Sequence, residues 1–293
     1  MVDVNRTAAI NSSLQSIQKV TKLASQAQEN LATGRKVNKV TDDPFSFFIA
    51  KSLTDRASDL TSRKDGVDQG ISSIRTASAG LESIEDFTQQ LKGLAEAAKS
   101  ASPSEQQALS RQFEELGKQI SNIAQDTSYQ GQNLLAGNNT IEVSFDTRDE
   151  SKLEVSGLDL DSSAFNAETS LFSANAFDAN GNFSLQEFGI AGGSFTNASI
   201  DDINSVIQQL DSGIDRLRGQ ASNLGGNVAI LQERLDFTEQ QINIQQEGAD
   251  KLILADLNEE AANSVAAQTG IQLGVNSLSI AGRQQGAILE VLS

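Results

Sequence analysis

The sequence predicts a mainly α-helical protein whose N- and C-terminal segments form a long antiparallel helical bundle or coiled coil, with a small central insert that contains a β-hairpin. Three observations support this prediction. Apolar residues recur at steps of three and four in both halves of the chain. Only two prolines, Pro44 and Pro103, occur. Residues 141–200 differ in character, because they hold seven of the 13 phenylalanines among Asn, Asp, Ser and Gly.

The first predicted helix covers about residues 10–31. Its apolar positions have a mean step of about 3.5 residues, which is the coiled-coil period. They are Ile10, Leu14, Ile17, Val20, Ala24, Ala27 and Leu31. Gly34 follows and supplies a natural helix stop.

Two more helices are predicted before residue 130. One runs from about Val67 to Ala95 and ends before Pro103. The next begins at Pro103, because Ser102 and Glu105 form a capping-box pattern around a proline at the first helical position.

The second half of the chain carries the most regular heptad pattern. Steps of four and three alternate without a slip over residues 203–242, which predicts one long helix. A last helix is expected over about residues 249–291, although its apolar stripe thins into small and polar residues and would bury little alone.

The central insert contains the only candidate for β-structure. Ile141, Val143 and Phe145 alternate with polar residues, and Leu153 and Val155 repeat the pattern after a polar turn. This alternation predicts a hairpin.

Composition argues against catalysis and against bound cofactors. The chain has no Cys, no His and no Trp, so thiol nucleophiles, imidazole metal sites and Ser-His-Asp triads are excluded. We expect no catalytic, metal-binding or cofactor-binding residues. A glycosidase-like carboxylate pair is formally possible, but Asp and Glu on helices usually form a solvated face.

Charge and hydropathy exclude two classes of partner. A formal net charge of -17 opposes binding to nucleic acid, and no basic stripe is present. No segment reaches the roughly 18 apolar residues of a membrane span, so membrane insertion is not expected.

Periodicity alone favours a self-contained bundle whose stripes are merely core. The composition of the outermost helices opposes that interpretation, because Gln, Asn, Ser and Gly crowd residues 5–33 and 258–293. Such helices gain little as an isolated pair in water, where ordering costs about 1–2 kcal/mol per residue. They would order more readily in an assembly that buries them on several sides.

Motifs at both ends resemble those of one family, the bacterial flagellins. Leu31-Ala-Thr-Gly34-Arg-Lys-Val-Asn38, followed by Asp42-Asp43, is similar to the family's L-S-S-G-x-R-I-N…D-D motif. Residues 65–71, Asp-Gly-Val-Asp-Gln-Gly-Ile, resemble its N-D-G-I-S region. Residues 255–281 are similar to flagellins of the alphaproteobacterial type.

The resemblance implies a division into three parts. Residues 1–40 with 255–293 would form a terminal coiled-coil domain that lines the inner tube. Residues 41–140 with 200–254 would form a helical-bundle domain, and residues 141–199 a variable outer segment of β and irregular structure.

The resemblance also implies a non-enzymatic function in swimming motility. The chain would be a secreted structural subunit that polymerises with itself into the flagellar filament. Its further partners would be the type III flagellar export apparatus, an export chaperone, the filament cap and hook-associated proteins. The expected subunit-assembly residues are Ile10, Leu14, Ile17, Leu31, Gly34, Asp42, Asp43, Leu278, Leu289 and Leu292.

One stretch departs from the family pattern. Many flagellins carry Q-R-V-R-E-L-A where an innate-immune receptor binds, whereas this chain has Gln89-Gln90-Leu91-Lys92-Gly93-Leu94-Ala95. The replacement of Arg by Gln90 and of Glu by Gly93 removes two charged hydrogen-bonding groups. We expect weak recognition by that receptor.

Two rival functions remain open at this point. A hook-filament junction protein has ends that resemble flagellin but forms only a short adaptor ring. A type III secreted translocator or adhesin also uses long helices, although a translocator usually needs an apolar membrane-inserting helix, which this sequence lacks.

Overall fold

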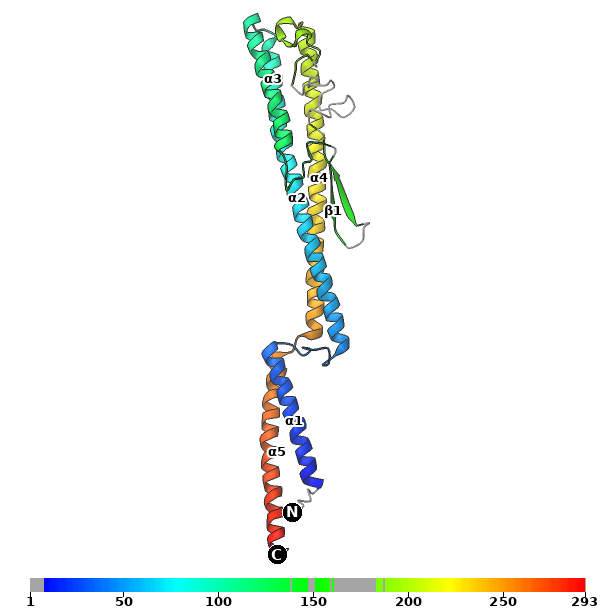
Figure 1. Ribbon diagram of the computed structural model, residues 1–293, viewed down its shortest axis with the longest axis vertical. Helices are drawn as coiled ribbons and strands as arrows, with labels where there is room; N and C mark the ends of the chain where they lie inside the picture. The colour runs from blue at the N-terminus through cyan, green and yellow to red at the C-terminus, as the bar shows by residue number, and fades with distance from the viewer. Residues whose placement is uncertain are drawn as a thin grey trace. The chain divides into compact units, whose positions relative to one another are not determined.

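The computed structural model describes residues 8–137, 139–146, 151–158, 160, 183–186 and 188–292 of the chain. Figure 1 shows long helices and one small hairpin, which confirms the predicted mainly α fold class. The helices are α1 Ala8–Thr33, α2 Pro44–Ala98, α3 Pro103–Asp126, α4 Ile200–Ile253 and α5 Leu257–Leu292. The strands are β1 Thr140–Ser144 and β2 Lys152–Ser156, and two 3₁₀ turns, η1 Ala191–Gly193 and η2 Phe195–Asn197, precede α4.

The chain divides into two compact units. The terminal unit consists of residues 1–58 and 242–293, and the larger unit consists of residues 59–241. The three-part division expected from the sequence remains a prediction.

In the larger unit, α2 and α4 lie antiparallel. Three ion pairs record this arrangement: Lys64 with Glu239, Glu85 with Arg218, and Lys92 with Asp211. The residue numbers of each pair rise along α2 and fall by the same amount along α4. The two helices therefore keep one register from Lys64 to Lys92. Such exposed pairs contribute little energy each, and their value here is to fix which residues face each other.

The predicted heptad stripes form the core of the larger unit. Ile74, Ile84 and Leu91 of α2 are buried with Leu210 and Leu231 of α4 in one hydrophobic cluster. Each fully buried aliphatic side chain contributes roughly 1.5–3 kcal/mol. Burial of these stripes therefore stabilises the pairing of α2 with α4.

The start of α3 confirms the predicted capping box. The Glu105 carboxylate accepts hydrogen bonds from the Ser102 backbone N–H at 2.8 Å and from the Ser102 hydroxyl at 2.7 Å. These bonds lower the pKa of Glu105, with the side-chain bond to Ser102 as the larger cause. Pro103 occupies the first helical position, where no backbone N–H is required.

The predicted hairpin is also present. β1 and β2 pair antiparallel, with Ile141 opposite Val155 and Val143 opposite Leu153. Val143 and Val155 are buried, and Glu142 and Glu154 face solvent. Val143 lies directly over Gly70 of α2, where an added Cβ would stand only 2.6 Å from Val143 Cγ2.

Two helix boundaries differ from the sequence prediction. α2 begins at Pro44, well before the expected Val67, because the Asp43 side chain caps this end. The expected helix from residue 249 is interrupted, since α4 ends at Ile253 and α5 begins at Leu257. The Asp256 carboxylate caps α5 by accepting hydrogen bonds from the Asn258 and Glu259 backbone N–H groups.

Phenylalanines of the central segment complete the core of the larger unit. The Phe113 ring of α3 contacts the rings of Phe183, Phe188 and Phe195, with centroids 5.5–5.8 Å apart. All four residues are buried. Phe183, Phe188 and Phe195 of the segment predicted as variable therefore pack on α3, while residues 161–182 lie outside the described part of the chain.

Substitution of Gly117→Ala should destabilise the larger unit by about 1–3 kcal/mol, because the new Cβ would overlap the Phe183 ring. Gly219→Ala is the matched control, since nothing lies within 4 Å of that position on α4. The control should gain about 0.5–1 kcal/mol of helix stability. Urea unfolding followed by circular dichroism measures both, and equal midpoints for the two variants would refute the packing.

Candidate functional site

The terminal unit is built on the pairing of α1 with α5. The two helices lie side by side and run antiparallel in Figure 1. The Asn30 side-chain amide donates a 2.8 Å hydrogen bond to Glu260 Oε1 near one end of the pair. Further along, Val20 lies beside Gly270 and Ile17 beside Gly274. The pairing therefore keeps one register over several turns.

Small residues let these two helices approach closely. An added Cβ at Gly274 would stand 2.6 Å from Ile17 Cγ1, and one at Gly270 would stand 3.2 Å from Val20 Cγ1. Ala24, Ala27 and Ala267 are buried in the same contact. A seam of small residues buries little apolar area, so the pair alone gains little from the hydrophobic effect.

The structure describes the side chains of only some of the predicted apolar assembly residues. Four of them are half-buried, namely Leu14, Ile17, Leu31 and Leu278. Ile10, Leu289 and Leu292 have helical backbones, but their side chains lie outside the described residues.

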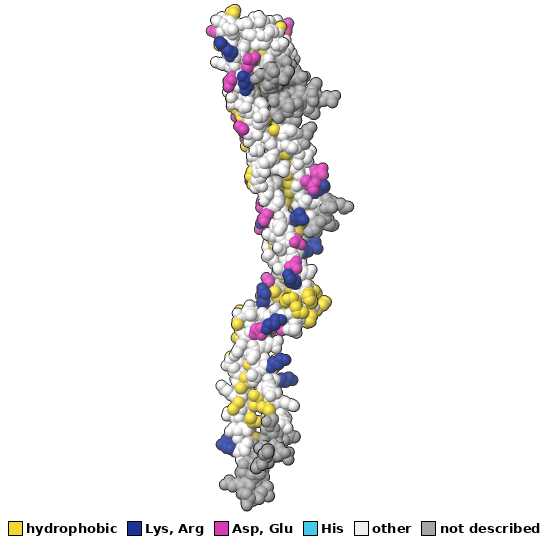
Figure 2. Space-filling model, viewed as in Figure 1, with side chains coloured by type: hydrophobic (Ala, Val, Ile, Leu, Met, Phe, Trp, Pro, Cys, Tyr) yellow, Lys and Arg dark blue, Asp and Glu magenta, His cyan; other side chains and the backbone are white. Residues whose placement is uncertain are grey.

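Large apolar side chains are also exposed on the helix pair. Leu23 is 54% exposed, Val265 64% and Leu273 62%, and Val275 and Ile280 are exposed as well. Figure 2 shows hydrophobic side chains on the surface over these helices. A half-open groove of about 480 Å³ lies between the helices, lined by Val20, Leu23, Ala27, Asn263, Ala267 and Gly270 among others.

Most of these outward residues were not predicted from the sequence. A single apolar stripe on each helix predicts only its buried side and leaves out the apolar residues beside that stripe. The signal that could have identified them is the spread of apolar residues to several sides of α5, which is typical of a helix buried on more than one side.

Backbone hydrogen bonds link the segment that connects α1 to α2 with the segment that connects α4 to α5. Gly34 ends α1 with φ of 70°, and its N–H donates to the Asn30 carbonyl at 2.8 Å. Its own carbonyl accepts from the Ala255 N–H at 3.0 Å, and the Lys36 N–H donates to the Ile253 carbonyl at 2.8 Å. Gly34 is thus both a helix stop and an anchor for the C-terminal segment.

Asp42 and Asp43 shape the turn into α2. Asp42 Oδ2 accepts hydrogen bonds from the backbone N–H groups of Asn38 and Lys39. Asp43 caps α2, with Oδ1 accepting from the Phe45 and Ser46 N–H groups and Oδ2 accepting from the Ser46 hydroxyl. The hydroxyl bond is the main cause of the lowered pKa of Asp43. Both carboxylates therefore act locally, as structural groups of this turn.

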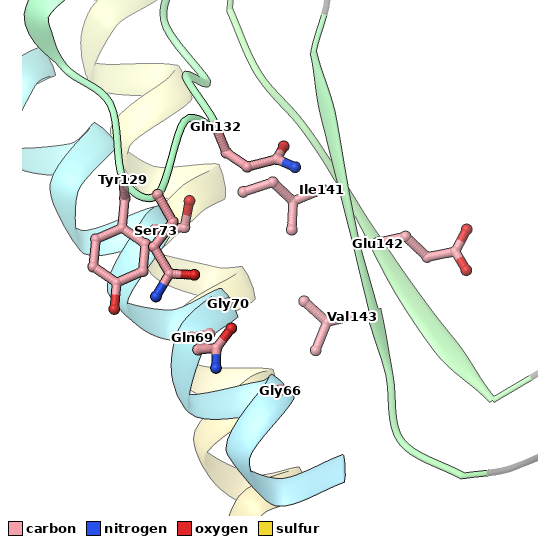
Figure 3. A pocket seen from close by; sticks show the side chains of 10 residues that line it. Gly66, Gln69, Gly70, Ser73, Tyr129, Gln132, Ile141, Glu142 and Val143 are labelled. Carbon is pink, nitrogen blue, oxygen red and sulfur yellow. The ribbon is translucent and has the colours of Figure 1, made fainter. Parts of the chain in front are cut away.

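A pocket in the larger unit was not predicted from the sequence. It has a volume of about 310 Å³ and lies between α2, the hairpin and the segment after α3. Figure 3 shows Ile141 and Val143 directed toward α2 over Gly66 and Gly70, while Glu142 points away. The lining consists of amide, hydroxyl, aliphatic and aromatic groups, and its one carboxylate, that of Glu142, points away from the other lining side chains.

The described residues contain neither a metal-binding cluster nor a membrane-spanning helix. No group of three or more His, Cys, Asp or Glu side chains that could hold a metal ion occurs in the described ranges. No helix within them is long and apolar enough to cross a membrane.

Comparison with known proteins gives consistent matches. The bacterial flagellin N-terminal helical region matches residues 4–140. Flagellin C of Rhizobium meliloti (strain 1021) is 24% identical over 319 residues, covering 99% of each chain. Flagellin FljM of Caulobacter vibrioides is 26% identical over 291 residues, covering 98% of this chain and 97% of its own.

The chain is thus similar to bacterial flagellins along nearly its whole length. The structure of a flagellar hook-associated protein from Vibrio parahaemolyticus is also similar, with a TM-score of 0.57 and 10% identity over 73% of this chain and 100% of that one. At that identity the likeness shows the shared fold alone. The predicted resemblance to alphaproteobacterial flagellins is confirmed.

The receptor-motif-like patch, Gln89 to Ala95, lies on α2 in the larger unit. Leu91 is fully buried, Leu94 is half-buried, and Lys92 pairs with Asp211 of α4. Gln90 and Gly93 are exposed, and Gln89 donates a hydrogen bond to Glu85. The two positions at which a charged residue of the family pattern is replaced by an uncharged one are therefore surface positions, where a charged side chain would be accessible to a partner.

The variant Gly34→Val should weaken the hydrogen-bonded contact between the α1–α2 and α4–α5 connections. A β-branched residue at positive φ costs about 1–2 kcal/mol, and the hydrogen bonds to Asn30 and Ala255 depend on that conformation. We expect shorter and fewer filaments in seeded growth than from a Gly34→Asn control, since Asn tolerates this conformation better. Equal filament length and yield for the two variants would show that the left-handed turn is not required.

Proposed function

We propose that this chain is a structural subunit of the bacterial flagellar filament and acts by polymerising with itself. The observation that carries the proposal is the exposed apolar surface of the α1–α5 pair in a chain that is similar to flagellins along nearly its whole length. Such a surface is unfavourable in water and becomes favourable when neighbouring subunits cover it. Assembly therefore supplies the burial that the helix pair lacks.

Full-length relatives favour the filament over the hook-filament junction. The alphaproteobacterial proteins that match along nearly the whole chain are named flagellins. The likeness to the hook-associated protein is a likeness of fold at 10% identity. We therefore place the protein in the filament, and the translocator or adhesin alternative is not favoured.

The domain roles follow from the same proposal. Residues 1–40 with 255–293 would line the inner tube, residues 41–140 with 200–254 would form the surrounding bundle, and residues 141–199 would include the outer segment. The assembly role of Ile10, Leu14, Ile17, Leu31, Leu278, Leu289 and Leu292 belongs to this proposal. Gly34, Asp42 and Asp43 would support it by fixing the turn between the two parts.

Export forms a further part of the proposal. The subunit would leave the cell unfolded through the type III flagellar channel, with a chaperone holding its C-terminal helix until export. It would then be added to the distal tip of the filament, beneath a cap protein. Hook-associated proteins would be further partners. A chain without Cys cannot form disulfides on this route. No substrate is turned over, since the family consists of structural proteins.

Purified protein should elongate filament seeds without nucleotide or metal, whereas a chain ending at Gly282 should not. The truncation removes Leu289 and Leu292 but leaves the core of the larger unit intact. A full-length Leu289→Asn/Leu292→Asn variant separates the loss of these side chains from the loss of chain length. Light scattering reports elongation, and circular dichroism reports that each variant stays folded. Normal elongation by both variants would contradict the proposed role of the C-terminal helix.

Receptor-reporter cells should respond weakly to this protein and more strongly to its Gln90→Arg/Gly93→Glu variant. Position 93 has nothing within 4 Å of an added Cβ, so the larger side chain is accommodated. Two restored charge-assisted hydrogen bonds should raise potency by at least about tenfold. The matched control is Gln89→Arg, which adds one charge beside the motif. An equal response to the native protein and the double variant would disprove the assignment.

A further inference from the structure

We propose that the pocket beside the hairpin binds a neutral saccharide of one or two sugar rings. The pocket lies in the larger unit, between α2, β1 and the Tyr129–Gln132 turn, and has a volume of about 310 Å³. It is separate from the apolar surface of the α1–α5 pair, so this inference does not depend on the proposed role in the filament. Four features support it: an unpaired hydroxyl, free amide groups, an open strand edge and a lining without inward charge.

The Ser73 hydroxyl is buried at the pocket and has no partner. Ser73 is 6% exposed, and its hydroxyl makes no hydrogen bond to any described residue. The neighbouring hydroxyls of Ser72, Thr76 and Ser78 instead bond to the backbone carbonyl four residues earlier in α2, at 2.9, 2.9 and 3.0 Å. Because buried polar groups are nearly always hydrogen-bonded, the Ser73 hydroxyl is available to a group that enters the pocket.

Three glutamine side chains add further donors and acceptors. Gln69 lies one turn before Ser73 on α2, and Gln130 and Gln132 lie in the turn that follows α3. Among the described residues, none of these three side-chain amides forms a hydrogen bond. Each amide both donates and accepts hydrogen bonds, so together they can bind hydroxyl groups in several orientations.

The Tyr129 ring supplies a flat apolar surface at the pocket. The Tyr129 N–H donates to the Gln132 carbonyl at 2.8 Å, and the Gln132 N–H donates to the Tyr129 carbonyl at 2.9 Å, so the turn is held in place. Figure 3 shows the Tyr129 ring on one side of the pocket and the Ile141 and Val143 side chains on the other. The C–H groups of a sugar ring can pack on such surfaces while its hydroxyls bond to polar groups.

The free edge of β1 offers backbone groups to the same pocket. The Phe145 N–H donates to the Ser151 carbonyl, and the Gly157 N–H donates to the Asn139 carbonyl. Hydrogen-bonded pairs alternate along an antiparallel ladder, so the odd-numbered residues of β1 bond to β2. The N–H and carbonyl of Glu142 therefore face away from β2. Since the Glu142 side chain points away from the pocket, its backbone is the part that lines it.

No charged side chain of the described residues points into the pocket. The Glu142 carboxylate accepts a 2.7 Å hydrogen bond from Lys152, which does not line the pocket, and the other lining groups are neutral. A phosphate, carboxylate or ammonium ligand would lose hydration there without gaining a counter-charge. A neutral ligand with closely spaced hydroxyls matches this lining. A volume of about 310 Å³ is at the lower end for ligand pockets, which suits one or two sugar rings.

Tyrosine fluorescence tests binding directly, because Tyr129 is the only Tyr and the chain has no Trp. The unassembled full-length chain is titrated with glucose, galactose, mannose and N-acetylglucosamine, and with glucuronate as the charged control. At least one neutral sugar should change the Tyr129 emission with a saturable dependence on concentration, and glucuronate should not. Polymerisation is not required for this measurement, so failure of seeded growth would leave its result unaffected.

Two pairs of variants test whether the sugar lies in the pocket. Gly66→Leu should abolish the fluorescence change by filling the pocket, since nothing lies within 4 Å of an added Cβ at this lining residue. Gly93→Leu, at an equally open position of α2 outside the pocket, should leave the change intact. Ser73→Ala should weaken binding several-fold, whereas Ser72→Ala removes a hydroxyl that bonds within α2 and should not.

Circular dichroism shows whether each variant stays folded. The inference would be overturned if none of the four neutral sugars gave a saturable change, or if glucuronate gave an equal one. Undiminished binding by folded Gly66→Leu, or equal affinities of Ser73→Ala and Ser72→Ala, would also overturn it.

Discussion

The close packing of α1 on α5 through small residues is the constraint on which the rest of the account depends. Gly270 and Gly274 bring α5 against Val20 and Ile17, so little apolar area is buried inside the pair. Larger apolar side chains such as Val265 and Leu273 are left facing solvent. A helix pair of this kind gains stability from neighbours, which links its sequence directly to polymerisation.

The larger unit is organised differently, because its stability is internal. The α2 and α4 heptad stripes and the Phe113 cluster form a continuous core, and three ion pairs keep the helices in register. This unit can therefore remain folded whether or not the ends are assembled. Because the core lies in the larger unit, that unit can be stable by itself. The apolar residues exposed on α1 and α5 still require neighbouring subunits to bury them.

Much of this fold could be predicted from residue spacing. The heptads, the Ser102–Glu105 cap and the Ile141–Val155 alternation are local patterns, and the structure contains the elements they predict. The start of α2 at Pro44 was missed, since it depends on the Asp43 cap in a stretch with no clear stripe. The outward faces were also missed, because periodicity identifies a buried stripe but says nothing about apolar residues beside it. Gly34 was predicted as a helix stop from its position after the first stripe, whereas Asp43 was identified only through a family motif, and the structure supplies the hydrogen bonds of both.

The central claim is that neighbouring subunits bury the outward apolar residues of the α1–α5 pair. An electron cryomicroscopy reconstruction of the filament, at a resolution that shows side chains, measures this burial directly. The account predicts that Leu23, Val265 and Leu273 contact other subunits and lose most of their present exposure. Filaments in which these side chains remain exposed to solvent would contradict it.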